Sequence, residues 1–293
     1  HNALKHYAKP VANAVGMLAD KIIENKGKKI VLVSLARAGI PIGILVKRYI
    51  KFKYGINVPH YSISIIRGRG IDDNAMKYLL EKYRPQQILF VDGWIGKGAI
   101  LNELKKDISA YEGVSADIAV VADPANVTEL CGTHEDILIP SSCLNSTVSG
   151  LISRTFLRDD IIGRDDFHGA VYYGELTDSD LSYDFIETIE KEFNMENTPD
   201  LEKRVESQGI DEVINIGKNF GIDDINLIKP GIGETTRVLL RRIPWKVLID
   251  ERYKGNPQLE HIVRLAEEKH TPVEYYPLTH YKCCGIIKKL ADA

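Results

Sequence analysis

Residues 86–100 combine an acid, spaced glycines and a lysine in an order that suits phosphate binding. Residues 88–91 are a continuous apolar run, which is typical of a strand buried on both faces of a parallel sheet. Asp92 follows that run, and a glycine-rich turn then leads into helical periodicity: Gly93, Gly96, Lys97 and Gly98. Such glycines let backbone N–H groups converge on an anion, while a helix N-terminus and a lysine add positive charge. The alternative is an ordinary strand-to-helix turn in which the glycines serve only the backbone geometry.

The spacing excludes two common nucleotide-binding motifs at this turn. A Walker loop has the pattern Gly-x-x-x-x-Gly-Lys-Ser/Thr, whereas here only Trp94 and Ile95 separate the first two glycines, and Gly98 follows the lysine. The dinucleotide fingerprint also fails, because the glycines have the wrong offsets and the acid precedes the turn. If this turn binds phosphate, it does so through another arrangement.

A second strand, turn and helix precede this one in the chain. Residues 30–33 predict a buried strand, residues 34–39 a turn of small residues, and residues 40–50 a helix. The turn can approach an anion closely and adds one positive charge through Ala36, Arg37, Ala38 and Gly39. The alternative is a tight turn with Arg37 in solvent. Two such units predict an open parallel sheet whose turns gather at one edge.

Two further segments carry candidate ligand groups. Residues 60–70 begin as an alternating strand and end in Arg67 and Arg69 between glycines. These arginines are candidate cations for an anionic leaving group, or alternatively part of a solvated loop. Residues 141–155 are dense in small polar side chains, and the candidate contacts for a substrate base or carbonyl are Ser142, Asn145, Ser146 and Thr147. Alternatively, these four residues only cap and pack a helix.

The remaining pattern divides into two parts. The first part also predicts helices over residues 3–23 and 182–193, and strands over residues 116–123, 135–140 and 170–173. A polar segment with Pro199, residues 194–200, is the expected linker. After it we expect a helix following Gly231, strands at 245–250 and 272–276, a helix at 257–269, and a final helix opened by residues 281–287. The chain is therefore predicted to be an α/β protein: a parallel-sheet domain, residues 1–195, followed by a small α/β/α sandwich, residues 205–293.

The composition is that of a globular protein with a full core. The chain has 293 residues, 44% of them hydrophobic, and a net charge of −3, which argues against a protein that coats nucleic acid over its whole surface. It has no long apolar run and no signal-peptide pattern, so we expect a cytoplasmic location and no membrane contact. The cysteines form no Cys-x-x-Cys pair and have no histidine at a spacing suited to zinc, so we expect reduced thiols and no metal-binding site among them. Because the chain begins at His1, we also expect further sequence upstream.

Both turns resemble loops of the type I phosphoribosyltransferases. The sequence VDGWIGKGA resembles their ribose-phosphate loop, and residues 35–41 resemble the pyrophosphate loop of the uracil-type enzymes. The resemblance implies a type I phosphoribosyltransferase-like sheet, 5-phosphoribosyl-1-pyrophosphate (PRPP) as co-substrate and Mg²⁺ as cofactor. By this resemblance Asp92 binds ribose hydroxyls and the Mg²⁺ carried by PRPP. The turn containing Lys97 then binds the 5-phosphate, the turn containing Arg37 binds pyrophosphate, and Arg67 and Arg69 close over the leaving group.

One departure from that family's pattern bears on activity. The usual loop has two adjacent acids and a Thr-Gly pair, whereas this chain has Gly93 after Asp92 and a Gly-Lys-Gly sequence. The departure implies either altered catalysis or a site that has kept only its binding function.

The C-terminal part resembles the Pelota-type RNA-binding domain. In that wider family a Gly-x-Asn-Glu-x-Thr-Lys turn enters the RNA, and residues 231–237 keep Glu234, Thr236 and a basic residue at Arg237, with Gly233 in place of the asparagine. The segment is locally positive, and further RNA-binding candidates are Arg241, Arg242 and Lys246. The alternative is a solvated helix face.

Over nearly its whole length the chain is similar to one family: phosphoribosyltransferase-like proteins of tellurite-resistance and stress operons, fused to a Pelota domain and also catalogued as StiP-type cysteine proteases. The leading hypothesis is a PRPP-dependent transferase that acts on a base, nucleotide or RNA-linked acceptor. One alternative is a non-catalytic RNA-binding module that senses a ribose phosphate. Another is a cysteine protease with Cys143 as nucleophile and His134 or His168 as base. The expected partners are PRPP or a related ribose phosphate and RNA, and a homodimer stays open.

Overall fold

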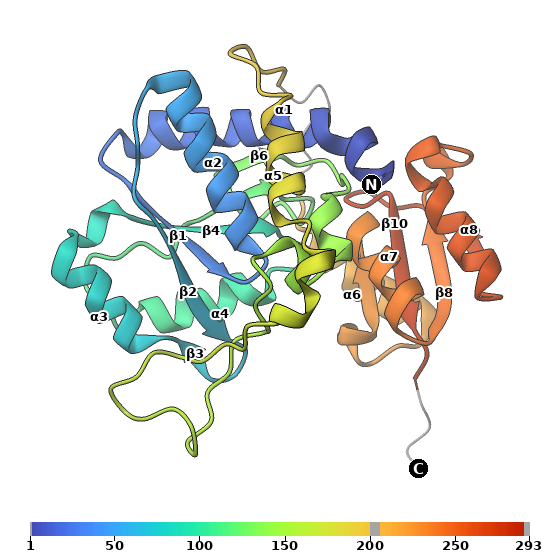
Figure 1. The fold of residues 1–293 in the computed structure, drawn as a ribbon. Helices are drawn as coiled ribbons and strands as arrows, with labels where there is room; N and C mark the ends of the chain where they lie inside the picture. The colour runs from blue at the N-terminus through green and yellow to red at the C-terminus, as the bar shows by residue number, and fades with distance from the viewer. Residues whose placement is uncertain (1, 200–205, 290–293) are drawn as a thin grey trace.

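Two sheets organise the chain, as the computed structural model shows for residues 2–199 and 206–289 (Figure 1). The first sheet has the strand order β3-β2-β1-β4-β5-β6. Its parallel strands are β1 (Val31–Ala36), β2 (His60–Ile66), β4 (Ile88–Trp94), β5 (Ile118–Ala122) and β6 (Cys131–Thr133). The short β3 (Gly70–Ile71) pairs antiparallel with β2. The predicted parallel sheet with its turns at one edge is confirmed.

Helices cover both faces of the first sheet. On one face lie α1 (Asn2–Lys26), α2 (Gly39–Tyr54) and α5 (Ser182–Glu190), and on the other lie α3 (Asp73–Lys82) and α4 (Ala99–Ile108). The strands are apolar on both faces because each face meets helices: Leu32 and Leu89 pack toward α1 and α2, while Val33 and Phe90 pack toward α3 and α4. No helix in the described part of the chain is long and apolar enough to cross a bilayer.

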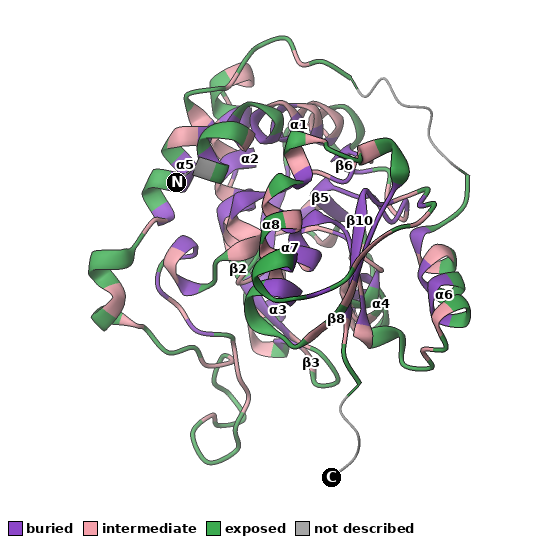
Figure 2. Ribbon diagram, turned by 90° about the vertical axis from the view of Figure 1, so that its right-hand side faces the viewer, coloured by how far each residue is buried: buried purple, intermediate pink, exposed green. Residues whose placement is uncertain are grey.

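The second sheet has four strands in the order β7-β10-β8-β9. These are β7 (Ile228–Pro230), β10 (Cys283–Ile287), β8 (Pro244–Ile249) and β9 (Val273–Tyr275). Two helices, α7 (Ile232–Arg241) and α8 (Glu260–Glu268), pack on one face, and α6 (Gly209–Phe220) packs on the other. The predicted α/β/α sandwich is confirmed. Figure 2 shows its central strand β10 buried and the outer sides of α6 and α8 exposed.

Short 3-10 turns connect these elements. They are η1 (Pro85–Gln87), η2 (Pro140–Cys143), η3 (Ser146–Val148), η4 (Gly174–Ser179), η5 (Ile225–Leu227), η6 (Glu251–Tyr253) and η7 (Pro257–Leu259). In the expected linker, the Asn197 side chain donates to Tyr49 Oη and Asp20 Oδ2, so this segment lies against α1 and α2. Residue 200 of that linker lies outside the described residues.

Three element predictions were wrong, each for a physical reason. Residues 281–287 form no helix: β10 is a central strand, whose short apolar run is buried on both faces and carries no period that separates strand from helix. Residues 135–140 form no strand. The strand in this part of the chain is β6, which ends earlier, at Thr133, and Pro140 begins η2. Residues 170–173 make a single isolated bridge, from Tyr172 to Ile152, because Val171 and Tyr172 are exposed and have no core to face.

Candidate functional site

Asp92 lies at the carboxyl edge of the first sheet, beside the turn that follows β1. Since β1 and β4 are neighbouring parallel strands, both predicted anion-binding turns leave the sheet at this edge. Gly39 permits their close approach, because a Cβ there would stand 2.5 Å from Val91 O and 3.1 Å from the Asp92 Cα. The turn before Gly39 contains a cis peptide between Ala36 and Arg37. The fold therefore brings Arg37 and Asp92 to one site.

A cavity of about 650 Å³ opens at this edge, which we call the sheet-edge cavity. The predicted site residues that line it are Ala36, Arg37, Ala38, Arg67, Asp92, Gly93, Ser142 and Asn145. Residues that sequence reasoning missed also line it: Trp94, Ser149, Arg154 and Thr155. Arg237, predicted as an RNA contact, reaches the same cavity from α7. Several guanidinium groups around one carboxylate suit a ligand that carries both negative charges and hydroxyl groups.

Asp92 is the acid of this cavity. Its Oδ1 accepts the N–H of Gly93 at 2.8 Å, and burial nevertheless raises the pKa of Asp92 to about 6. At neutral pH the ionised carboxylate therefore has lost more hydration than its hydrogen bond to Gly93 replaces. Ligand hydroxyl groups that donate to this carboxylate would stabilise it.

Arg37 lines the same cavity as three other arginines, Arg67, Arg154 and Arg237. Its Nη1 donates to Ile152 O at 3.0 Å. Burial lowers the pKa of Arg37, and the neighbouring Arg154 lowers it further. A guanidinium stays charged at neutral pH, so repulsion between these arginines is relieved when an anion binds between them.

The glycine-rich turn after Asp92 opens onto a different cavity of about 250 Å³, which we call the α4 cavity. Lys97 and Gly98 line it at the N-terminus of α4. Lys105 lines it from the last turn of the same helix. Gly98 has a φ of 86°, in the left-handed region that favours glycine. Arg67 lines both cavities, so the two predicted anion sites adjoin at this residue.

Lys97 is engaged by the second domain. Its Nζ donates to Ile225 O at 2.8 Å and to Ile228 O at 3.0 Å. Burial lowers the pKa of Lys97 to about 8, with a further contribution from Lys229. Nearby, Gly96 O accepts a hydrogen bond from Tyr281 Oη at 2.6 Å. This turn therefore holds the two domains together as well as bordering the α4 cavity.

Other predicted site residues lie outside the sheet-edge cavity. Arg69 is exposed in the tight turn between β2 and β3, where its N–H donates to Ile66 O. Ser146 is buried, and Thr147 O accepts the N–H of Leu181. These two residues stabilise the local chain, whereas Ser142 and Asn145 face the cavity.

The turn predicted to enter RNA lies against the first domain. Ile232 N–H donates to Asp136 Oδ1 at 3.0 Å. Thr236 is buried, and its Oγ1 donates to Ile232 O. A Cβ at Gly233 would stand 2.8 Å from Ser142 Oγ and 3.2 Å from the Trp94 ring, which explains why no side chain is present there. Glu234 pairs with Arg237 across 2.7 Å.

Two of the predicted RNA-binding residues, Arg242 and Lys246, follow the C-terminal end of α7, and Lys246 also pairs with Glu274. Arg242 is exposed, and Lys246 Nζ lies 4.7 Å from the centroid of the Phe220 ring and 5.4 Å from that of Trp245. Phe220 also contacts Tyr276. Lysine and aromatic rings on one surface provide charge and stacking platforms together, as single-stranded nucleic acids require. Arg241 instead donates to Cys143 O at 2.8 Å.

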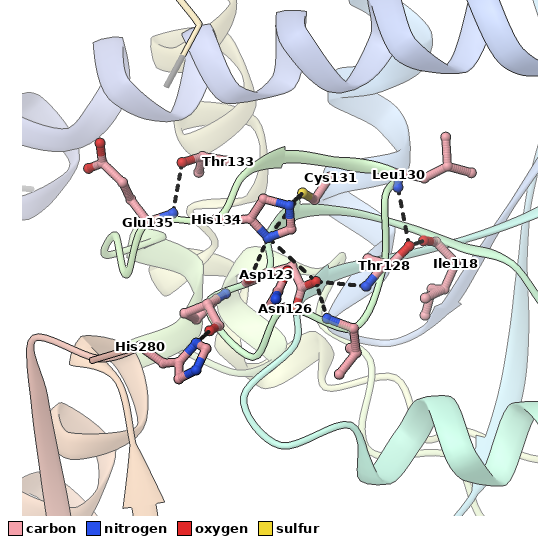
Figure 3. Close-up of polar contacts among 12 residues, drawn as sticks. Ile118, Asp123, Asn126, Thr128, Leu130, Cys131, Thr133, His134, Glu135 and His280 are labelled. Atoms are coloured by element: carbon pink, nitrogen blue, oxygen red, sulfur yellow. Dashed lines mark hydrogen bonds and ion pairs between the residues drawn. The ribbon is translucent and has the colours of Figure 1, made fainter. Parts of the chain in front are cut away.

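Cys143 does not form the predicted thiol–imidazole pair in the described structure. Its Sγ lies 3.9 Å from Ser142 Oγ, and burial raises its pKa. His168 Nδ1 instead bonds Ser64 Oγ at 2.9 Å. His134 lies against another thiol: its Nε2 is 3.4 Å from Cys131 Sγ (Figure 3). The spacing Cys131-x-x-His134 was present in the sequence as a signal for this pairing.

Two family models match this chain. The model described as "Tellurite-like stress resistance cysteine protease StiP" matches residues 1–190, and the "PELOTA RNA binding domain" model matches residues 207–289. A curated relative from Acinetobacter baylyi (strain ATCC 33305 / BD413 / ADP1), named "Cysteine protease StiP", is 32% identical over 309 residues, which cover 98% of this chain and 80% of the relative.

Solved structures similar to part of this chain include two phosphoribosyltransferases. A hypoxanthine-guanine phosphoribosyltransferase from Bacillus anthracis is 18% identical with a TM-score of 0.31, over 42% of this chain and 71% of that one. An HGPRT-ase from Leishmania tarentolae in complex with GMP is 15% identical with a TM-score of 0.32, over 45% and 75% of the two chains. These likenesses are too distant to say anything about activity.

Proposed function

This chain belongs to the StiP family, and we propose that it binds PRPP in the sheet-edge cavity and transfers the phosphoribosyl group to a base, nucleotide or RNA-linked acceptor. The observation that carries the proposal is the placement of Asp92 among Arg37, Arg154 and Arg237 at the carboxyl edge of the parallel sheet. In open α/β sheets, ligands bind outside the carboxyl ends of the strands.

The arginines of the cavity act on the leaving group. In the transfer, the bond between ribose C1 and the pyrophosphate oxygen breaks, and its electron pair leaves with the pyrophosphate. The acceptor atom forms the new bond to C1 and loses its proton to solvent. Three guanidinium groups that line the cavity can bind the negatively charged pyrophosphate as it leaves: those of Arg37, Arg154 and Arg237.

Asp92 acts on the ribose. Its carboxylate accepts hydrogen bonds from the ribose hydroxyls and fixes the sugar at the sheet edge. Mg²⁺ fits this donor set, because it takes carboxylate and phosphate oxygens with few protein ligands, and it would neutralise charge on the pyrophosphate. We place the 5-phosphate in the α4 cavity beside Gly98, Lys105 and Arg67. Lys97 also lines this cavity while its Nζ donates to Ile225 O and Ile228 O.

RNA would bind to the surface formed by Phe220, Arg242, Trp245, Lys246 and Tyr276. The Pelota match and the stacking of Lys246 over aromatic rings support this part of the proposal. Changing Trp245 to Ala should weaken binding of a single-stranded RNA by roughly tenfold, since base stacking contributes about 1–3 kcal/mol. Gel-shift titration measures the effect, and Tyr183→Ala, an exposed aromatic on α5, is the matched control that should bind normally.

The experiment that tests the transferase is calorimetric titration of the full chain with PRPP and Mg²⁺, combined with an assay for released pyrophosphate. We expect micromolar binding that Asp92→Asn weakens by at least about tenfold, because a carboxylate–hydroxyl contact contributes about 1.5–3 kcal/mol. Arg69→Gln, outside both cavities, should bind as the parent does. Equal binding by Asp92→Asn and the parent would contradict the proposal. Binding without pyrophosphate release with any base or RNA acceptor would favour the ribose-phosphate-sensing module.

Cysteine-dependent proteolysis is the second candidate, because the Acinetobacter relative is named a cysteine protease. The contact of 3.4 Å between Cys131 and His134 favours it, since a thiol nucleophile needs an adjacent imidazole. The complete burial of Cys131 speaks against it, because a peptide carbonyl must reach the sulfur. Casein hydrolysis that survives Asp92→Asn but is lost in Cys131→Ala or Cys143→Ala would establish a protease.

A further inference from the structure

Three side chains that can bind metal ions meet where β5 and β6, the last two strands of the first sheet, end (Figure 3). One ligand atom from each of Asp123, Cys131 and His134 lies within 4.8 Å of those of the other two. Cys131 Sγ is 3.4 Å from His134 Nε2 and 3.8 Å from its Nδ1, and His134 Nδ1 is 3.8 Å from Asp123 Oδ2. The cluster thus presents sulfur, nitrogen and oxygen donors around one point.

The sheet topology creates the cluster. β5 and β6 are parallel neighbours in register, with Val120 opposite Cys131, so Asp123 and His134 both follow the carboxyl ends of their strands. Asp123 N–H donates to Thr133 O at 2.9 Å and continues the ladder past the end of β5. On the other side, Gly132 lets α1 cover β6, because a Cβ there would stand 2.0 Å from Ala14 O. The cluster is therefore built on rigid elements.

Surrounding hydrogen bonds orient two of the donors. Asp123 Oδ2 accepts the N–H groups of Val127 and Thr128 at 2.7 and 2.8 Å, which fixes the carboxylate. His134 Nδ1 lies 2.9 Å from Asp123 O. In the tautomer that donates from Nδ1 to this carbonyl, Nε2 is unprotonated and its lone pair points toward Cys131 Sγ. A metal-binding imidazole is commonly oriented in this way, with its second nitrogen bonded to a backbone carbonyl.

We propose that Asp123, Cys131 and His134 bind a divalent transition metal ion of the zinc class. Zinc bonds of about 2.3 Å to sulfur and about 2.0–2.1 Å to nitrogen place tetrahedral ligand atoms roughly 3.4–3.6 Å apart. The distance of 3.4 Å between Cys131 Sγ and His134 Nε2 agrees with this spacing, and the ligand atoms of all three side chains lie within 4.8 Å of one another. The thiolate selects against Mg²⁺ and Ca²⁺, which take oxygen ligands. On binding, the Cys131 thiol gives its proton to solvent and its sulfur bonds the ion, so affinity rises with pH.

The fourth coordination position faces the second domain. A cavity of about 340 Å³ between the domains is lined by His134, Glu129, Glu135, His280 and Lys282. The side chain of His134 is 23% exposed, whereas Asp123 and Cys131 are completely buried. Three protein ligands with an open position on the His134 side leave room for water or a small ligand on the ion. A buried thiolate that no peptide can approach suits metal binding better than nucleophilic attack.

The test uses the full chain, stripped with a chelator and titrated with Co²⁺ as a spectroscopic substitute for zinc. We expect one equivalent of Co²⁺ to bind with thiolate-to-cobalt charge-transfer absorption, which Zn²⁺ abolishes by competition. Cys131→Ser should lose this absorption. Cys143→Ser, which changes a half-buried thiol outside the cluster, should retain it. Absence of charge transfer in the parent, or its persistence in Cys131→Ser, would overturn the proposal.

A second variant covers the case in which Cys131→Ser does not fold. His134→Gln changes the partly exposed ligand, and we expect at least about tenfold weaker Co²⁺ binding and loss of the thermal stabilisation that a bound ion gives. Undiminished Co²⁺ affinity in folded His134→Gln would also contradict the metal site. Covalent labelling of Cys131 by a peptide-like epoxide, unaffected by Zn²⁺, would instead identify the cluster as a protease nucleophile and base.

Discussion

At the scale of single residues, Asp92 should make the proposed binding of PRPP depend on pH. Burial raises its pKa to about 6, and only the ionised form accepts hydrogen bonds from ribose hydroxyls through both oxygens. The affinity for PRPP with Mg²⁺ should therefore fall by about tenfold for each pH unit below 6. Calorimetry between pH 5 and pH 8 measures this profile. The Asp92→Asn profile gives the titration of the ligand itself, and identical profiles would show that Asp92 is not the titrating group.

Arg237 is the residue through which the second domain reaches the sheet-edge cavity. Charge-assisted hydrogen bonds contribute about 1.5–3 kcal/mol, so Arg237→Gln should weaken PRPP binding by roughly tenfold or more. Arg242→Gln is the matched control, because Arg242 is exposed and lies outside both cavities. Parallel calorimetric titrations compare the two variants, and equal losses in both would mean that Arg237 contributes only general charge.

At the scale of elements, Gly39 fixes the distance between α2 and β4. Gly39→Ala places a Cβ 2.5 Å from Val91 O, so either α2 or β4 must move. Overpacking of this kind costs about 1–3 kcal/mol. We expect a lower free energy of unfolding in urea and weaker PRPP binding, because the turn at Arg37 is displaced from Asp92. Gly96→Ala is the control for stability, since a Cβ at Gly96 meets nothing within 4 Å. Equal stability of the two variants would show that the sheet edge absorbs the methyl group.

At the scale of the whole molecule, Asp136 joins the domains. Its carboxylate accepts the N–H of Ile232 at 3.0 Å and of Lys282 at 2.9 Å, and burial raises its pKa to about 6. The folded pKa exceeds the unfolded value, so the folded state binds more protons between pH 4 and pH 6. Stability from this group is therefore greatest below pH 4 and is lost as pH rises to 6, by about 3 kcal/mol.

Urea unfolding across this pH range, compared between the parent and Asp136→Asn, measures the contribution of Asp136. The amide does not titrate, so the difference in unfolding free energy between the two proteins should change over pH 4–6 and stay constant above it. The loss of one acceptor should also cost about 1–3 kcal/mol, because a buried N–H is left unpaired. A difference that does not vary with pH would assign the titration to other carboxylates.

Much of the first domain was predictable because its signals are local. The apolar runs before Arg37 and Asp92, and the turns after them, specify strand, loop and helix within about twenty residues of chain. Where the local signal is ambiguous, prediction failed: residues 281–287 have the same apolar character as a buried helix, and only pairing with β7 and β8 makes them a strand. The predicted membership of the family is confirmed by the matches to both parts of the chain.

The sequence by itself determined where the two predicted anion-binding turns lie, since each depends on neighbouring residues and on the rule that parallel strands end at the same edge. Only the tertiary structure decided which residues surround them. Arg237 is 145 positions from Asp92 and reaches the cavity because α7 packs against Trp94 and Ser142. Likewise, Asp123 meets Cys131 and His134 through the register of β5 and β6. Because packing between elements brings Arg237 and Asp123 to these sites, spacing along the chain could not predict their positions.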